Sequence, residues 1–484
     1  MTINELLTNR VFEIFYEISQ IPHGSYHEAA ISDWLVQWAK ERDFYVEQDE
    51  LKNVLIRRPA TKGYEKAKGI LLQAHMDMVC EKILTSDHDF ERDSIKWVID
   101  GDWLSTGGET TLGADDGIGM ALAMALLEED FVHPPMEVLF TVAEEEDMSG
   151  AIGFDAAKLE AVYVVNIDHV NDTEILCGSC GGKCIEAELP VKWAELPDKW
   201  NTYQLKVSGL KGGHSGEDIH RGHGNAISLL ARMIMEMEKH TELKLCSMNA
   251  GTFRLAIPRD AECVIAIPFS KETEVMEMVA SYGKEIKNEY QSAGNDIQFV
   301  LCESKDSYDR AAKADPFINL MLLSPNGIRE MSADIENLVN TSINLGEFYL
   351  YENGYKAIYE VRSAYDSARD FTGEVVERLV TMLGGTIKMH SAYPCWEYRP
   401  SSELRKIAEK IFTETNGSAP KSYAVHAGLE CGCFFETRPD LDAISVGPNC
   451  VGLHSPEERL SISSTKKMYG MLQKLVREVC LEEK

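Results

Sequence analysis

The chain has no long apolar segment. None of its apolar runs approaches the roughly 20 residues that a membrane-spanning helix needs. Its first residues, MTINELLTNRVFEIF, also lack the basic start and the uninterrupted apolar stretch of a signal peptide. We therefore expect a cytoplasmic protein with no membrane partner.

Positive charge is scarce relative to negative charge. The 484 residues include 48 Lys and Arg against 79 Asp and Glu, a formal charge of −31. Such acidity repels phosphate groups, so nucleic acid and anionic membranes are poor candidate partners, and its simplest role is solubility. The sequence also lacks a G-x-G-x-x-G after its first apolar strand and any G-x-x-x-x-G-K-[ST], which leaves a nucleotide-binding α/β protein without support.

The cysteines do not suggest a disulfide framework. The 12 cysteines are scattered, and without a secretory signal we expect reduced thiols. Cys177, Cys180, Cys431 and Cys433 form two closely spaced pairs that could together make a Cys₄ zinc site. Buried thiols are the interpretation that we favour.

Buried strands and helices alternate in the first part of the chain. Residues 69–74, 136–142 and 162–167 are short apolar runs typical of buried parallel strands, and residues 117–129 have the pattern of a buried helix. A further apolar strand is expected at residues 443–447. This alternation predicts an α/β domain with a mixed, largely parallel sheet.

The pattern changes near residue 187. Alternating strands around two long helices, 225–240 and 273–293, predict a separate α+β unit. The total length is also too great for one ordinary core. We predict an α/β domain made of residues 1–186 and 394–484, interrupted by an inserted α+β domain of residues 187–393.

Acidic residues and histidines gather at the ends of the predicted strands. They are His75 and Asp77 after residues 69–74, Glu144, Glu145 and Glu146 after 136–142, Asp168 after 162–167, and His454 beyond 443–447. Asp115 and Asp116 directly precede the buried helix. Parallel strands bring their carboxyl ends to one edge of a sheet, where ligands bind in open α/β folds. We expect these segments to meet in one crevice.

The residue types at this edge are those of a metal site. Imidazole and carboxylate groups bind Zn²⁺ when thiols are absent, and Mn²⁺ or Co²⁺ would suit a similar site. Two metals about 3.5–4 Å apart can share one carboxylate. Five ligands fit such a pair, namely His75, Asp115, Glu145, Asp168 and His454. Asp77 lies two residues from His75, on the same face of an extended chain, where it could accept the free ring N–H.

Each of these residues also has an ordinary structural interpretation. An aspartate after a strand, or in Asp115-Asp116-Gly117, often caps a helix, and a run such as Glu144–Glu146 is common in solvated loops. Taken together, however, these ordinary interpretations require five independent coincidences at strand ends. Three adjacent carboxylates after a buried strand also repel one another, and a bound cation relieves that repulsion. The whole set therefore favours a metal site.

The motifs around these residues resemble those of a known family, and they occur in order. They are AHMDMV (74–79), LGADDGIG (112–119), EE before MSG (144–150), NID (166–168), GGHSG (212–216), VRS (361–363), HAGLECG (426–432) and HSPEE (454–458). Throughout its length the chain is similar to the cocatalytic-zinc peptidases of the carnosinase and carboxypeptidase G type. Among them it most resembles the bacterial aminoacyl-histidine dipeptidases. The resemblance implies a catalytic domain with an inserted lid domain that hydrolyses Xaa-His and other unblocked dipeptides.

The resemblance also implies a role for each residue of the site. Its metal ligands would be His75 and Asp168 on one zinc ion, Glu145 and His454 on the other, and Asp115 as the bridge. Asp77 would orient His75, and Glu144 would be the general base that activates a water. The Asp115–Asp116 peptide bond is expected to be cis.

Substrate recognition is implied for residues farther along the chain. His214, in the inserted domain, would stabilise the tetrahedral oxyanion, commonly across a homodimer. Arg362 would bind the C-terminal carboxylate of the dipeptide, with Asn225 and Glu430 as further substrate-binding residues. His223 and Cys395 stand where the family often has arginine and glycine, so the preferred dipeptide is not fixed by the resemblance.

Two other functions are compatible with the same ligand set. A deacylase of N-acyl amino acids, or a carboxypeptidase, would use the same metals on another substrate. A non-catalytic metal-binding protein on this fold would keep the ligands without turnover. The presence of Glu144 beside the full ligand set speaks against that last alternative.

Overall fold

The computed structural model describes residues 1–294 and 296–481 and divides into two compact units. Unit 1 comprises Met1–Ser179, Trp396–Ala424 and Leu429–Lys484, and unit 2 comprises Cys180–Cys395 and Val425–Gly428. The predicted insertion is residues 187–393. Unit 2 begins earlier because strand β9, which starts at Gly181, already pairs within its sheet. No helix in the described ranges is long and apolar enough to cross a membrane.

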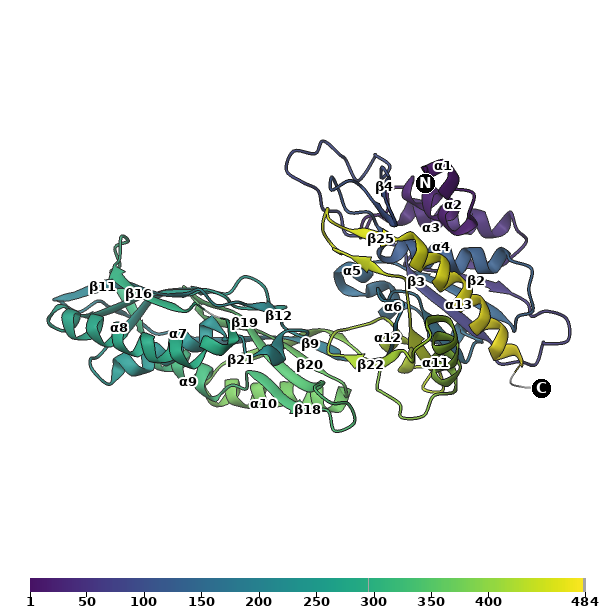
Figure 1. Cartoon of the computed structure of the whole chain (residues 1–484). Helices are drawn as coiled ribbons and strands as arrows, with labels where there is room; N and C mark the ends of the chain where they lie inside the picture. Colours follow the sequence, from purple (N-terminus) through teal and green to yellow (C-terminus); the bar gives the residue numbers. More distant parts are fainter. Residues whose placement is uncertain (295, 482–484) are drawn as a thin grey trace. The chain divides into compact units, whose positions relative to one another are not determined.

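An eight-stranded sheet forms the centre of unit 1 (Figure 1). Its strands, in spatial order, are β1 (Tyr45–Gln48), β2 (Val54–Arg58), β6 (Met136–Thr141), β3 (Ile70–His75), β7 (Tyr163–Asn166), β23 (Asp442–Ser445), β8 (Glu174–Ser179) and β22 (Lys421–Val425). The neighbours β6, β3, β7 and β23 are parallel, whereas β1, β2 and β8 pair antiparallel. The mixed sheet and the four predicted strands are confirmed, and the parallel part is its centre.

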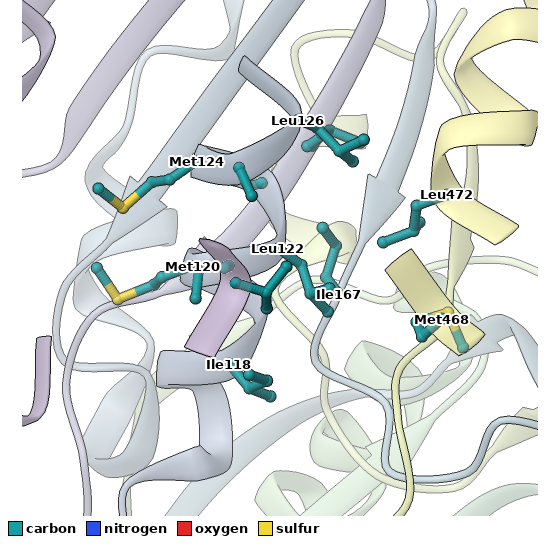
Figure 2. Packing of buried hydrophobic residues seen from close by; sticks show 14 of the residues in the cluster. Ile118, Met120, Leu122, Met124, Leu126, Ile167, Met468 and Leu472 are labelled. Carbon is teal, nitrogen blue, oxygen red and sulfur yellow. The ribbon is translucent and has the colours of Figure 1, made fainter. Parts of the chain in front are cut away.

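Helices cover this sheet and complete the core of unit 1. They are α1 (Ile3–Leu6), α2 (Arg10–Ser19), α3 (Ala29–Lys40), α4 (Ala114–Glu128), α5 (Glu144–Asp147), α6 (Ser149–Gly153), α11 (Glu403–Asn416), α12 (Cys431–Phe435) and α13 (Ile462–Leu481). Helix α4 is apolar on every side, and it is buried on every side. Figure 2 shows its residues Ile118 and Leu122 in one cluster with Ile167 and with Met468 of α13. This packing fixes the start of α4 beside the strand ends.

A small second sheet in unit 1 carries the loop that contains His454. Its strands are β4 (Val98–Asp100), β5 (Trp103–Ser105), β24 (Cys450–Val451) and β25 (Arg459–Ser461), in the order β24-β25-β5-β4. The hairpin of β24 and β25 is held by antiparallel pairing of β25 with β5. His454 lies in the connection between its two strands.

Unit 2 is an α+β unit with an 11-stranded sheet. Its strands are β9 (Gly181–Pro190), β10 (Trp193–Glu195), β11 (Trp200–Ser208), β13 (Lys244–Ala250), β15 (Ala261–Pro268), β16 (Gln298–Glu303), β17 (Arg310–Lys313), β18 (Gly327–Met331), β19 (Val339–Tyr351), β20 (Gly354–Ser363) and β21 (Thr386–Tyr393), with β12 (Gly213–His214) and β14 (Ala256–Ile257) as a separate pair. Its helices are α7 (Ala226–Glu238), α8 (Glu272–Glu289), α9 (Asp315–Leu323) and α10 (Asp366–Met382) (Figure 1). The two long helices predicted from the sequence are α7 and α8, and a separate hydrophobic cluster joins the helices to the sheet.

Candidate metal centre

The parallel strands of unit 1 end at one edge, and each delivers a polar side chain there. His75 is the last residue of β3, and β3 pairs in parallel with both β6 and β7. Glu144 and Glu145 follow β6 at the start of the short helix α5, and Asp168 follows β7. The topology therefore places three of the predicted segments side by side.

Asp115 lies between two histidines at this edge. Its Oδ1 is 3.2 Å from Nε2 of His75, and its Oδ2 is 3.3 Å from Nε2 of His454. Nε2 of His75 is also 3.6 Å from Oδ1 of Asp168, and Nε2 of His454 is 3.0 Å from Oε2 of Glu145. All five predicted ligands therefore lie together. They form two sets, His75 with Asp168 and His454 with Glu145, and Asp115 lies between them.

Three overlapping groups of side chains in unit 1 have the geometry to hold a metal ion. Within each, the ligand atoms lie within 4.8 Å of one another; the groups are His75 with Asp116 and Asp168, His75 with Glu144 and Glu145, and Asp115 with Glu145 and His454. Asp116 was not predicted as a ligand, and its Oδ2 accepts a hydrogen bond from the backbone N–H of His75 at 3.3 Å. The Asp115–Asp116 peptide bond is cis, as the resemblance implies.

The electrostatics of this cluster fit a cation. Burial raises the pKa of Asp168 to about 7 and that of Glu144 well above its usual range, and nearby carboxylates add to both effects. Hydrogen bonds to Asp115 and Glu145 raise the pKa of His454 to about 10. Oε1 of Glu145 is buried without a hydrogen-bond partner in the described part of the chain. Carboxylates outnumber imidazoles here, and bound divalent ions would compensate the excess charge.

Asp77 supports two parts of the cluster at once. Its carboxylate lies 3.3 Å from Nδ1 of His75, the contact expected of an orienting residue. The same carboxylate accepts hydrogen bonds from the backbone N–H groups of Glu144 at 3.0 Å and Glu145 at 3.2 Å, and from the hydroxyl of Ser25 at 2.8 Å. Its side chain is fully buried, so these bonds are shielded from water. One carboxylate therefore fixes His75 and the Glu144–Glu145 backbone relative to each other.

Unit 2 contains a buried arginine without a carboxylate partner. Arg362, on β20, is 4% exposed and donates hydrogen bonds to the hydroxyls of Tyr393 at 2.7 Å and Ser215 at 3.4 Å. His214 lies beside it, with its Nε2 3.4 Å from Nη2 of Arg362. Among the described residues no carboxylate forms an ion pair with this guanidinium. The buried carboxylate of Glu360, two residues earlier on β20, helps to raise the pKa of Arg362 and so offsets part of the cost of burying this cation. An anionic ligand would offset that cost further, so the arrangement suits one.

Asn225 has a structural role within unit 2. Its Oδ1 accepts hydrogen bonds from the backbone N–H groups of Ile227 and Ser228, so it caps helix α7. Its Nδ2 donates to the carbonyl of Leu345 at 2.8 Å. These contacts favour capping over the substrate contact that was predicted for this residue.

No cysteine belongs to any of the candidate metal groups in the described residues. In the described residues Cys177, Cys180, Cys431 and Cys433 form no disulfide, and Cys177, Cys180 and Cys431 are buried. The interpretation as buried thiols therefore holds for these three, and the Cys₄ zinc site finds no support.

Comparison with known proteins identifies the family of this chain. Residues 205–293 match the peptidase dimerisation domain. A cytosol non-specific dipeptidase from Escherichia coli (strain K12) is 37% identical over 480 residues, which cover 99% of either chain. The chain belongs to the M20 peptidase family.

Solved structures place the chain more closely within the M20 family. The crystal structure of aminoacylhistidine dipeptidase from Vibrio alginolyticus superposes with a TM-score of 0.90 at 34% identity, covering 99% of this chain and 98% of that one. A tripeptidase from Staphylococcus aureus has a TM-score of 0.58 at 16% identity over 98% of each chain, which shows the shared fold alone. The resemblance to aminoacyl-histidine dipeptidases is therefore confirmed.

A buried polar network lies close to the candidate metal ligands of this M20 protein. Glu430, fully buried, accepts hydrogen bonds from Gln73 at 2.5 Å and from Thr141 at 2.7 Å. Gln73 in turn accepts from the side chain of Asn166 at 2.7 Å. Gln73, Thr141 and Asn166 lie on β3, β6 and β7, close to the ends of the strands. Glu430 was predicted to bind substrate, and these contacts favour a supporting role close to the ligands.

Proposed function

We propose that this chain is a dipeptidase that uses two zinc ions. His75 and Asp168 would hold one ion, Glu145 and His454 the other, and Asp115 would bridge them. The observation that carries the proposal is the position of Asp115, whose two carboxylate oxygens each face a different histidine. Zinc is the choice that this imidazole and carboxylate donor set favours. When bound, the ions lower the pKa of a water toward neutrality and polarise the scissile carbonyl.

Glu144 is the general base in this proposal. In the described part of the chain its carboxylate accepts no hydrogen bond, whereas its backbone N–H is held by Asp77. The carboxylate is therefore available to take a proton from the attacking water and to return it to the leaving amine. Burial raises its pKa, which suits a group that must hold the proton between these two steps.

The choice of dipeptides is tested by comparing substrates. We expect kcat/KM to be highest for an Xaa-His dipeptide or another unblocked dipeptide, and much lower for a tripeptide or an N-acyl amino acid of the same composition. Preference for the N-acyl amino acid would identify a deacylase. Metal binding without turnover of any dipeptide would identify a non-catalytic protein.

Arg362→Ala should raise KM for dipeptides at least tenfold, because it removes a charge-assisted bond to the C-terminal carboxylate of the substrate. Tenfold corresponds to about 1.4 kcal/mol, close to the lower end of the roughly 1.5–3 kcal/mol that a hydrogen bond to a charged group contributes. Steady-state kinetics on one dipeptide and on its C-terminal amide measure the effect. The amide should lose affinity for the unaltered enzyme, and the variant should no longer distinguish the two substrates.

A matched control for Arg362 is Arg378→Ala. Arg378 is an exposed arginine on α10 of the same unit. The Arg378→Ala variant should leave KM for dipeptides unchanged. An unchanged KM in Arg362→Ala would show that the substrate carboxylate binds elsewhere.

His214 is proposed to stabilise the oxyanion from the partner subunit of a homodimer. The match to the peptidase dimerisation domain supports the dimer, and sedimentation analysis tests it. Burial and the neighbouring Arg362 lower the pKa of His214 to about 4, so it would act as a neutral donor.

Subunit mixing separates action across the dimer from action within one chain. Glu144→Gln and His214→Ala should each be nearly inactive alone. After the two are unfolded, mixed and refolded together, mixed dimers would contain one site with Glu144 and His214 intact. We expect a substantial recovery of activity. A mixture as inactive as its parents would show that His214 does not act across subunits.

A further inference from the structure

A buried carboxylate lies against the turn that carries Asp115. Glu458 is four residues after His454, directly before β25, and is 2% exposed. It accepts hydrogen bonds from four consecutive backbone N–H groups: Leu112 at 2.7 Å and Gly113 at 3.1 Å on Oε2, and Ala114 at 2.8 Å and Asp115 at 3.3 Å on Oε1. No side-chain donor from the described residues is among its hydrogen-bond partners. Both oxygens of the Glu458 carboxylate therefore accept hydrogen bonds from the backbone of this turn.

The turn depends on this outside acceptor. A helix start leaves backbone N–H groups without partners, and a side chain at the N-cap usually accepts from them. Here the N-cap is Gly113, which has no side chain and a left-handed backbone with φ of 69°. Asp115 and Asp116 also depart from helical backbone angles. Glu458 therefore supplies the cap from more than 300 positions away in the sequence.

The same carboxylate joins two ligand-bearing segments. Glu458 belongs to the loop that presents His454, and it holds the backbone of Asp115. Oδ2 of Asp115 lies 3.3 Å from Nε2 of His454, and its Oδ1 lies 3.2 Å from Nε2 of His75. A shift of the turn would change both distances together. Glu458 thus holds in place the backbone of Asp115, the residue whose carboxylate the two metal ions would share.

We propose that Glu458 is a positioning residue that sets the affinity of the metal pair by fixing Asp115 between the two histidines. The proposal rests on the proposed function in its assignment of the ligands. A purely structural cap and a positioning residue lead to different expected results. A cap contributes to the stability of unit 1 alone, whereas a positioning residue changes metal binding beyond any change in stability.

The test is Glu458→Gln. The amide has the same size, but its NH₂ group faces two N–H donors, so at least half of the contacts are lost. We expect the dissociation constant of the metals, measured on metal-free protein by chelator competition, to rise about 10–100-fold, as for other outer-shell changes. At saturating metal, KM for a dipeptide should stay within about twofold while kcat falls. Metal affinity is measured without substrate, so this test is independent of whether the chain is a dipeptidase.

Two controls make the result decisive. Glu457→Gln changes the exposed neighbouring residue and should leave metal affinity unaltered. Asp442→Asn weakens the capping of α11, where Asp442 accepts from Leu404 N–H at 3.1 Å, at the opposite end of the sheet strands from the ligands. Thermal unfolding of the metal-free proteins measures the loss of stability in each variant.

Glu458→Gln should weaken metal binding more than Asp442→Asn at a comparable loss of thermal stability. Wild-type metal affinity in Glu458→Gln, or an equal weakening in Asp442→Asn, would overturn the proposal. If the Gln variant does not fold, Glu458→Asp replaces it. That variant keeps the charge but withdraws the carboxylate by one methylene, and it should also weaken metal binding. Unchanged metal affinity in a folded Asp variant would overturn the proposal equally.

Discussion

Glu144→Gln should lower kcat by about 10²- to 10⁴-fold while the protein still binds two metal ions. Glutamine has nearly the shape of glutamate but cannot take a proton from water or return one to the leaving amine. The neighbouring ligand Glu145 should keep its position, because Asp77 accepts from the backbone N–H groups of residues 144 and 145 and not from the side chain of Glu144. Metal content by atomic emission and single-turnover kinetics on a dipeptide together measure the effect.

The matched control for this prediction is Glu146→Gln. Glu146 is exposed and lies two residues farther along α5. It should retain nearly full activity. A Glu144→Gln enzyme with both metals and a near-normal kcat would remove Glu144 from the mechanism.

Asp115→Ala should disrupt both metal sites, since the other four ligands belong to one site each in the proposal. Its carboxylate is the one that faces both His75 and His454. We expect metal binding to weaken by more than the roughly 10–100-fold typical of outer-shell changes, and dipeptide hydrolysis to be lost. Isothermal titration of the metal-free protein measures the stoichiometry and affinity.

Asp130→Ala is the control for the change of charge. Asp130 is exposed and lies shortly after the far end of the same helix, α4. It should bind two ions like the unaltered protein. Two ions bound with normal affinity by Asp115→Ala would show that the metals lie elsewhere.

Much of unit 1 was predictable because its signals are local. A buried central strand such as β3 must be apolar on both faces, so residues 69–74 stand out between polar segments. The polar residues directly after β3, β6 and β7 could be assigned to one edge, because parallel neighbours end together. The start of unit 2 was less predictable, since β9 continues directly from β8 with only Cys180 between them.

The supporting contacts could not be predicted, because they join residues far apart in the sequence. Nothing near Glu458 indicates that its carboxylate meets the N–H groups of residues 112–115, although the residue lies in the quoted HSPEE motif. The bonds from Asp77 to the backbone of Glu144 and Glu145 likewise follow from the way β3 and β6 end. Asn225 did carry a local signal. It immediately precedes an apolar helix, the ordinary position of an N-cap.

In the proposed metal centre, five residues from separate strand ends and loops hold a pair of neighbouring cations. Diffraction data collected at the zinc absorption edge from crystals grown with zinc would locate these ions. We expect two anomalous peaks about 3.5–4 Å apart. Both should contact Asp115, one with His75 and Asp168 and the other with Glu145 and His454. A single peak, or peaks away from these side chains, would show that these five residues do not hold a metal pair.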